Sequence, residues 1–232
     1  MAPSERPYRG IEAAERLAKR RGRLLAAGLD LLGSDQPDIS ELTVRGICRR
    51  AGLAARYFYE SFTDKDEFVG AVFDWVVAGL AATTQAAVAT VPANEQSRAR
   101  MANVVRIIAE DARIGRLLFS THLANAVVVR KRAESTGLFA LLTGQHAGDA
   151  LRMPANERIN AGAHFVVGGV AQTISAWLAG DVQLEPEQLV DQLATLIDEV
   201  ANPTLYGLKE KAAGATAASP DPAATSASWS GG

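Results

Sequence analysis

The chain has 232 residues, of which 48% are hydrophobic but only 6% aromatic, and its formal net charge is −2. This length accommodates one large or two small domains, and the near-neutral charge argues against a protein that coats nucleic acid regardless of sequence. The single cysteine, Cys48, excludes an intrachain disulfide, which is typical of a cytoplasmic protein.

A first helix is predicted over about residues 12–32, after a flexible lead of residues 1–9 that has no apolar signal-peptide core. Basic residues crowd this helix and the next two, whereas the remainder of the chain is net acidic. The crowded basic residues are Lys19, Arg20, Arg21, Arg23, Arg45, Arg49, Arg50 and Arg56. A localised basic face on a near-neutral chain favours site-specific DNA binding.

Two short helices are predicted next, over about residues 43–51 and 54–61, with Gly52 in the turn between them. Glycine suits a sharp turn because it reaches positive φ at no steric cost. In the second helix Phe58 and Phe62 are expected to point inward, while Arg56 and Tyr59 share the opposite face. This arrangement predicts a helix-turn-helix whose second helix enters the major groove of DNA.

These residues resemble the DNA-binding domain of the TetR family of bacterial transcriptional regulators. The likeness runs from RRGRLLAAGLDLLGS (20–34) through LTVRGICRRAGL and the recognition helix RYFYESF to TDKDEF, where a fourth helix begins. It implies an all-α fold, with an N-terminal three-helix helix-turn-helix DNA-binding domain over residues 1–62. A larger helical effector-binding and dimerisation domain is expected over residues 63–208, followed by a disordered Ala/Ser/Gly/Pro-rich tail over residues 209–232.

The resemblance also implies a set of DNA contacts. Arg56, in the first turn of the recognition helix, is the strongest candidate for reading a base, and Arg45 is a second. Phosphate contacts are expected from Thr43 at a helix N-terminus, from the hydroxyls of Tyr57 and Tyr59, and from Lys65 as a point charge. The full predicted set is Thr43, Arg45, Ala55, Arg56, Tyr57, Tyr59 and Lys65.

The chain departs from the family pattern at positions that bear on these contacts. Ala54 stands where a capping Ser is usual, and the loss of such a cap costs about 1 kcal/mol, so we expect the recognition helix to order fully only on DNA. Gly46 replaces an acidic or larger residue, and Tyr57 and Phe58 replace a small residue and a Leu. The operator sequence therefore does not follow from the resemblance.

Further helices are predicted over about residues 63–90, 94–109, 112–118, 123–142 and 156–178, and from Pro186 to the stop at Asn202 and Pro203. Residues 159–180 carry no charge and are long enough to cross a bilayer. Their polar side chains and glycines favour a helix buried in a protein core instead, so no membrane association is predicted.

The last two long helices are the predicted dimerisation pair. The first contains Gly162, Gly168 and Gly169, which allow helices to approach closely, and the second has a leucine stripe that includes Leu189 and Leu193. Packed against their symmetry mates, the two helices would form a four-helix bundle in a homodimer. Periodicity alone leaves open that these stripes bury against their own chain.

A small-molecule effector site is expected among the helices after residue 63, on the strength of the resemblance. The aliphatic composition there favours a hydrophobic or amphipathic ligand. The candidate ligand-binding residues are Trp75, Phe119, His122, Phe139, His164, Gln172 and Trp177, although residue type alone favours core packing over ligand contact for each of them.

An enzymatic function is not predicted. The chain has no nucleophile elbow, phosphate-binding loop or dinucleotide fingerprint, and its histidines lack the spacing of a helical metal pair, so no catalytic residue, metal or cofactor is expected. The prediction is a ligand-released transcriptional repressor that binds a palindromic operator as a homodimer. The alternative is a helical DNA-binding or protein-interaction module that responds to no ligand.

Overall fold

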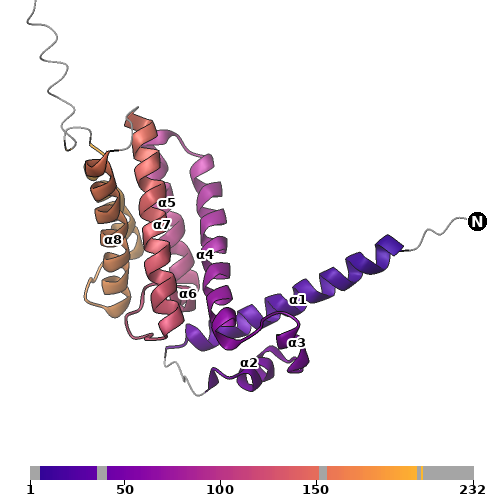
Figure 1. Ribbon diagram of the computed structural model, residues 1–232. Helices are drawn as coiled ribbons and strands as arrows, with labels where there is room; N and C mark the ends of the chain where they lie inside the picture. The colour runs from indigo at the N-terminus through magenta and orange to yellow at the C-terminus, as the bar shows by residue number, and fades with distance from the viewer. Residues whose placement is uncertain (1–5, 36–40, 152–155, 203–204, 206–232) are drawn as a thin grey trace, which may run out of the picture.

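A computed structural model describes residues 6–35, 41–151, 156–202 and 205, and within these residues every regular element is a helix (Figure 1). In chain order the elements are α1 (Arg6–Leu32), α2 (Val44–Ala51), α3 (Arg56–Tyr59), α4 (Lys65–Ala89), the 3₁₀ turn η2 (Ala93–Glu95), α5 (Gln96–Glu110), α6 (Ala112–Phe119), α7 (Ala126–Leu151), α8 (Glu157–Ala179) and α9 (Pro186–Val200). The predicted all-α fold is confirmed. The tail predicted over residues 209–232 lies outside the described residues.

The boundaries of three helices differ from the prediction. Helix α1 begins at Arg6 rather than near residue 12, so residues 6–9 are helical and not a flexible lead. Helix α7 continues to Leu151, beyond the predicted end at residue 142, because its last turns pack against α8, with Gly144 close to Ala163. Helix α3 is shorter than predicted, and its missing side-chain cap falls at Ala55 and not at Ala54.

Helices α2 and α3 lie together beside α1 at one end of the molecule, and α4 rises from this end into the body (Figure 1). The turn between α2 and α3 has the predicted form, since Gly52 adopts φ 63° and ψ 39° and its N–H bonds to the carbonyl of Arg49. At the other end of α2, the Thr43 hydroxyl accepts a hydrogen bond of 3.0 Å from the Gly46 N–H. Thr43 and Gly52 thus cap the two ends of α2, the first helix of the helix-turn-helix.

The first hydrophobic core joins the helix-turn-helix to the body. At its centre Phe58, Phe62 and Phe68 pack with ring centroids 5.1–5.4 Å apart. The cluster continues along α4 and reaches Leu117 and Leu123 around the corner between α6 and α7. The core thus extends across the domain boundary proposed at residues 62 and 63.

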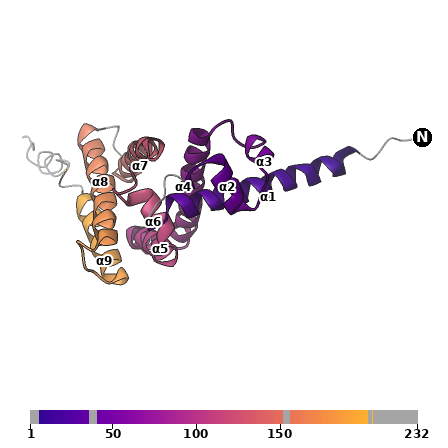
Figure 2. The same ribbon diagram turned by 90° about the horizontal axis from the view of Figure 1, so that it is seen from below.

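A second core holds α5, α8 and α9 together at the far end of the body (Figure 2). Its buried residues are aliphatic or Met, among them Ile108, Ile174, Leu189 and Leu193. Leu189 and Leu193 of the α9 stripe therefore pack within their own chain, which is the alternative that the sequence left open, whereas Leu196 is 49% exposed.

Helix α4 connects the two ends of the molecule. Its N-terminal half lies in the first core, and further along, the buried Asn103 of α5 donates hydrogen bonds of 3.1 and 2.9 Å to the hydroxyls of Thr83 and Thr84. Among the described residues α4, and not residues 159–180, is the segment long and apolar enough to cross a membrane, with a mean hydropathy of 1.4. Only 17% of its apolar 18-residue window is buried, and the buried residues of α4 lie between Phe68 and Val76, where the helix packs in the first core.

Candidate DNA interface and ligand pocket

The predicted DNA-binding residues come from the ends of α2 and α4 and from α3, which lie at the same end of the molecule (Figure 1). All of them are exposed except Tyr57, which is half-buried. Tyr59 is the more open of the two predicted tyrosines, with 62% of its surface exposed. The structure therefore presents this predicted set as one accessible surface.

The departure from the family pattern at Gly46 has a steric cause. A Cβ atom added to Gly46 would collide with the carbonyl oxygen of Glu41. The chain enters α2 so closely that the carbonyl of Glu41 lies over the first turn of the helix. Only glycine at position 46 leaves space for it. The neighbouring Arg45 is exposed in the first turn of α2, two residues after the Thr43 cap.

Much of the basic character of α1 is used inside the protein. Arg20 pairs with Glu60 at 3.0 Å, Arg21 donates to the Ser61 carbonyl at 2.9 Å, and Arg23 donates to the Ala51 carbonyl at 2.6 Å. These bonds fasten the C-terminal end of α3 and the C-terminal end of α2 to α1. The sequence suggested a basic face here, but these guanidinium groups largely hold the helix-turn-helix together.

Two of the three arginines of α2 are likewise paired. Arg49 binds Glu41, and Arg50 Nε lies 3.1 Å from Asp30. This pairing agrees with the interpretation that neither is a primary DNA contact. Arg45, Arg56 and Lys65 remain as the exposed cations of the predicted set, and no ion pair of theirs is found within the described residues.

The start of α4 is capped so that Lys65 is held at its first position. The Asp64 carboxylate accepts a hydrogen bond from the Glu67 N–H at 2.8 Å. Glu67 in turn accepts from the Thr63 hydroxyl at 2.6 Å and from the Thr63 N–H at 2.7 Å. These hydrogen bonds lower the pKa of the Glu67 carboxyl, and the bond from the Thr63 hydroxyl has the largest effect.

The predicted ligand-binding residues are not gathered in one cavity. Trp75, Phe139, His164 and Gln172 are exposed. Trp177 is half-buried beside the second core, where its indole N–H donates to the Leu184 carbonyl at 2.9 Å. Phe119, also half-buried, packs against both cores.

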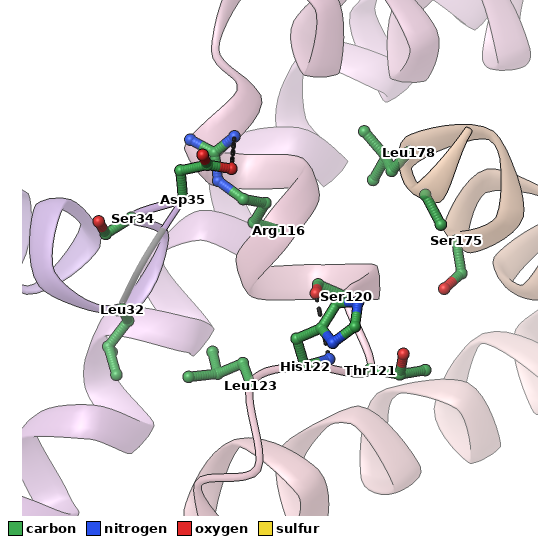
Figure 3. A pocket seen from close by; sticks show the side chains of 11 residues that line it. Leu32, Ser34, Asp35, Arg116, Ser120, Thr121, His122, Leu123, Ser175 and Leu178 are labelled. Atoms are coloured by element: carbon green, nitrogen blue, oxygen red, sulfur yellow. Dashed lines mark hydrogen bonds and ion pairs between the residues drawn. The ribbon is translucent and has the colours of Figure 1, made fainter. Parts of the chain in front are cut away.

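His122 lines a pocket of about 290 Å³ at the junction of α1, α6 and α8 (Figure 3). Leu32, Leu123 and Leu178 provide its apolar surface. The polar residues that line it are Ser34, Asp35, Arg116, Ser120, Thr121, His122 and Ser175. These residues come from segments far apart in the chain, so no local motif in the sequence could have predicted the pocket.

The pocket borders a tight joint between α1 and α6. Arg116 Nε donates to the Gly33 carbonyl at 2.6 Å, and its Nη1 lies 3.9 Å from Asp35 (Figure 3). A Cβ added to Gly33 would lie 2.5 Å from the Arg113 carbonyl oxygen, so the two helices touch through their backbones. A molecule in the pocket would therefore press directly on the end of α1.

Ion pairs extend this joint to the helix-turn-helix. Asp30 of α1 binds both Arg50 of α2 and Arg113 of α6. Hydrogen bonds from Arg113 lower the pKa of the Asp111 carboxyl, and Asp111 raises the pKa of the Arg113 guanidinium in return. Both groups therefore stay charged, and α6 is linked to α2 through α1.

Several apolar side chains of α7 and α8 are left exposed by the residues that the structure describes. Leu138, Leu141 and Leu142 of α7 are each about half exposed, and Phe165 of α8 is 71% exposed. A Cβ added to Gly168 or Gly169 would meet no atom within 4 Å. We call these residues of α7 and α8, 138, 141, 142, 165, 168 and 169, the α7–α8 face.

The described residues contain no group of three or more His, Cys, Asp or Glu side chains that could hold a metal ion. The buried Cys48 lies in the first core, where desolvation raises the pKa of its thiol. It is a packing residue, as its place in the apolar stripe of α2 predicts.

The fold defined by these elements is that of the TetR family of transcriptional regulators. A fatty acid degradation regulator, FadR, from Bacillus halodurans superposes with a TM-score of 0.61 at 14% identity, covering 82% of this chain and 96% of its own. FadR from Bacillus subtilis in complex with stearoyl-CoA gives 0.55 at 13% identity, covering 75% and 96%. A TetR-like regulator from a Rhodococcus species gives 0.55 at 18% identity, covering 81% and 96%. No protein-family model and no curated protein matches the chain.

Proposed function

We propose that this chain is a sequence-specific DNA-binding transcriptional regulator of the cytoplasm, a repressor that a small ligand releases from its operator. The observation that carries this proposal is the exposed Arg56 on α3, a helix whose flanking residues are tied to α1 by Arg20 and Arg21. Rigid support behind an exposed arginine is what base reading in the major groove requires. We propose no enzymatic activity.

The DNA contacts divide into two kinds. Arg56 and Arg45 reach base edges, with Ala55 allowing close approach, while Thr43, Tyr59 and Lys65 contact phosphates at the ends of α2, α3 and α4. Tyr57, the remaining residue of the set, is considered separately below.

A homodimer is part of the proposal, with recognition helices in successive major grooves about 34–36 Å apart on a palindromic operator. Helix α8 remains in the proposed interface, since Phe165 protrudes close to the open positions at Gly168 and Gly169 and a two-fold axis can place one in the other. The exposed leucines of the α7–α8 face favour α7 as its neighbour in the interface. Helix α9, whose Leu189 and Leu193 pack in the second core, would contribute its outer side.

The pocket between α1, α6 and α8 is the proposed effector site. At about 290 Å³ it lies at the lower end of the range for small-molecule sites, and it combines leucines with hydroxyl, guanidinium and carboxylate groups. An amphipathic ligand suits this lining. The similarity in fold to a regulator bound to stearoyl-CoA supports a ligand with a hydrocarbon part.

The ligand would act by differential affinity for two states. It binds better when α6 is displaced from α1, and the displacement passes through Gly33, Arg113 and Asp30 to α2. Coupling of 1–3 kcal/mol is typical between such sites. Movement of α4, which shares the first core with α6, would change the spacing of the recognition helices.

The test is selection of random and genomic DNA fragments by the purified protein, followed by sequencing of the bound sites. A recovered palindrome with half-sites about one helical turn apart supports a dimeric regulator. Salt-sensitive binding without an enriched sequence would instead favour an architectural module, and no DNA binding would favour a protein-interaction module.

Variants of two exposed cations sharpen this test. Arg56→Ala is expected to reduce the ratio of operator to random-DNA affinity, because one base contact is worth about 1–3 kcal/mol of discrimination. Lys65→Ala is expected to weaken both affinities together and to reduce the salt dependence by about one charge. Equal loss on all DNA from Arg56→Ala would reject its assignment as a base-reading residue.

A further inference from the structure

Tyr57 makes contacts that set it apart from the other residues of the recognition surface. Its hydroxyl accepts a hydrogen bond of 2.8 Å from Arg56 Nη2, and the Arg56 guanidinium carbon lies 4.7 Å from the centroid of its ring. The guanidinium carbon of Arg20 lies 4.5 Å from the same centroid. Tyr57 thus contacts one arginine on α1 and one on the exposed face of α3.

These contacts connect α1 to Arg56 through the side chains of Arg20 and Tyr57. Arg20 is fixed at its outer end by the ion pair with Glu60, and its Nε is buried without a hydrogen-bond partner. A buried donor without a hydrogen-bond partner is unfavourable. The ion pair with Glu60 and the stacking on Tyr57 nevertheless hold Arg20 in place. The ring of Tyr57 packs against the Arg20 guanidinium, and its ring and hydroxyl both contact the Arg56 guanidinium.

Neighbouring residues on a helix do not normally face each other, because their side chains point about 100° apart. Arg56 is nevertheless turned back onto Tyr57. An exposed arginine otherwise samples many rotamers, and ordering it on DNA costs conformational entropy. The bond to Tyr57 reduces that cost because it restricts the guanidinium before DNA arrives.

We propose that Tyr57 is a specificity-determining positioning residue, which holds the Arg56 guanidinium for base reading and does not serve as a phosphate contact. This inference rests on the proposed function. Arg56 Nη2 carries two hydrogens, so the second hydrogen and those of Nη1 stay available to the O6 and N7 acceptors of a guanine. Tyr59, which has no such contact with Arg56, is the phosphate-binding tyrosine of the pair.

The experiment uses the full-length protein and a DNA duplex recovered by selection with that protein. Affinities for this duplex and for a random duplex are measured for the unaltered protein, Tyr57→Phe, Arg56→Ala and the double variant. Tyr57→Phe keeps the ring and removes only the oxygen. We expect it to lower the ratio of specific to random affinity roughly three- to tenfold, as for one lost hydrogen bond.

The double variant separates positioning from direct contact. If Tyr57 acts through Arg56, Tyr57→Phe will cause no further loss of the ratio once Arg56 is alanine, so the two losses will not add. Tyr59→Phe is the matched control, and we expect it to weaken both duplexes alike while leaving the ratio unchanged. The salt dependence should be the same in Tyr57→Phe as in the unaltered protein, because no charge is removed.

Each outcome decides a different point. An undiminished effect of Tyr57→Phe in the Arg56→Ala background, or an equal loss on both duplexes, would overturn the positioning role alone. Failure of the unaltered protein to select any sequence would overturn the proposed function, and the inference with it.

Discussion

The two cores of this protein differ in composition and in the part of the chain that builds them. The first, around the helix-turn-helix, contains three packed phenylalanine rings and residues from six helices. The second, between α5, α8 and α9, buries aliphatic side chains and Met101, and Phe119 and Trp177 are partly buried against it. Aromatic rings pack with preferred geometry, so the three rings of the first core fix α3 against the start of α4.

The difference has a functional meaning under the proposal. The first core runs from the recognition helix to the corner between α6 and α7, beside the pocket. A change in the pocket can therefore reach α3 through packed side chains. Leu178, which also lines the pocket, packs against the second core, but that core contains no residue of the helix-turn-helix. The following variants test whether the two regions behave as differently as their packing indicates.

The largest effect is expected from truncation of the aromatic core. Phe58 is fully buried, and Phe58→Ala should destabilise the protein by about 3–5 kcal/mol. Leu193→Ala in the second core should cost about 2–5 kcal/mol. Urea unfolding followed by far-UV circular dichroism measures both. Loss of DNA binding at concentrations of urea where most helix remains, seen for Phe58→Ala and not for Leu193→Ala, would establish that the cores are separable.

A smaller effect is expected at the joint between α1 and α6. Gly33→Ala places a methyl group 2.5 Å from the Arg113 carbonyl oxygen, so one helix must shift, at a cost of about 1–3 kcal/mol. Gly79→Ala on α4 meets no atom within 4 Å and should stabilise the protein by about 0.5–1 kcal/mol through helix propensity. Thermal unfolding distinguishes the two, and equal effects at the two sites would contradict the tight joint.

The cap of α2 should contribute less. Thr43→Ala removes the hydrogen bond to the Gly46 N–H and is expected to cost about 1 kcal/mol. Thr43→Ser, which retains the hydroxyl, is the matched control and should restore most of that stability. If Ala and Ser at this position gave the same unfolding midpoint, the hydroxyl would have no capping role.

The smallest expected effect is a pH dependence at the start of α4. Hydrogen bonds from Thr63 lower the pKa of Glu67 in the folded protein, so its contribution to stability is present above its ordinary pKa of 4.5 and is lost as pH falls through the lower folded value. Glu67→Gln should therefore flatten the acid limb of the stability curve below about pH 4.5. Unfolding midpoints measured from pH 6 to pH 3 test this, and identical acid limbs would show that Glu67 contributes nothing.

The sequence predicted the DNA-binding end of the molecule better than the body. Short-range chemistry defines that end: Thr43 caps a helix, Gly52 turns the chain, and Phe58 and Phe62 face inward, all as expected. Helices α1 and α7 were predicted too short, because their extra turns contain Pro7 and Gly10 in α1 and Gly144 and Gly148 in α7, residues that locally disfavour a helix. Of the seven predicted ligand-binding residues, His122 alone lines the pocket.

The sequence by itself determined the elements whose causes lie within a few residues of one another: the helices, their caps, the turn and the exposed arginine of α3. The tertiary structure alone decided which charges stay free for a partner at the helix-turn-helix, because Arg20, Arg21 and Arg23 of α1 bind Glu60, Ser61 and Ala51 some 28–40 positions along the chain. It also decided the pocket, whose walls come from three separate segments, and the packing of Leu189 and Leu193 of α9 within the chain. Hydrophobic periodicity states that a face is buried, but it carries no information about what covers that face.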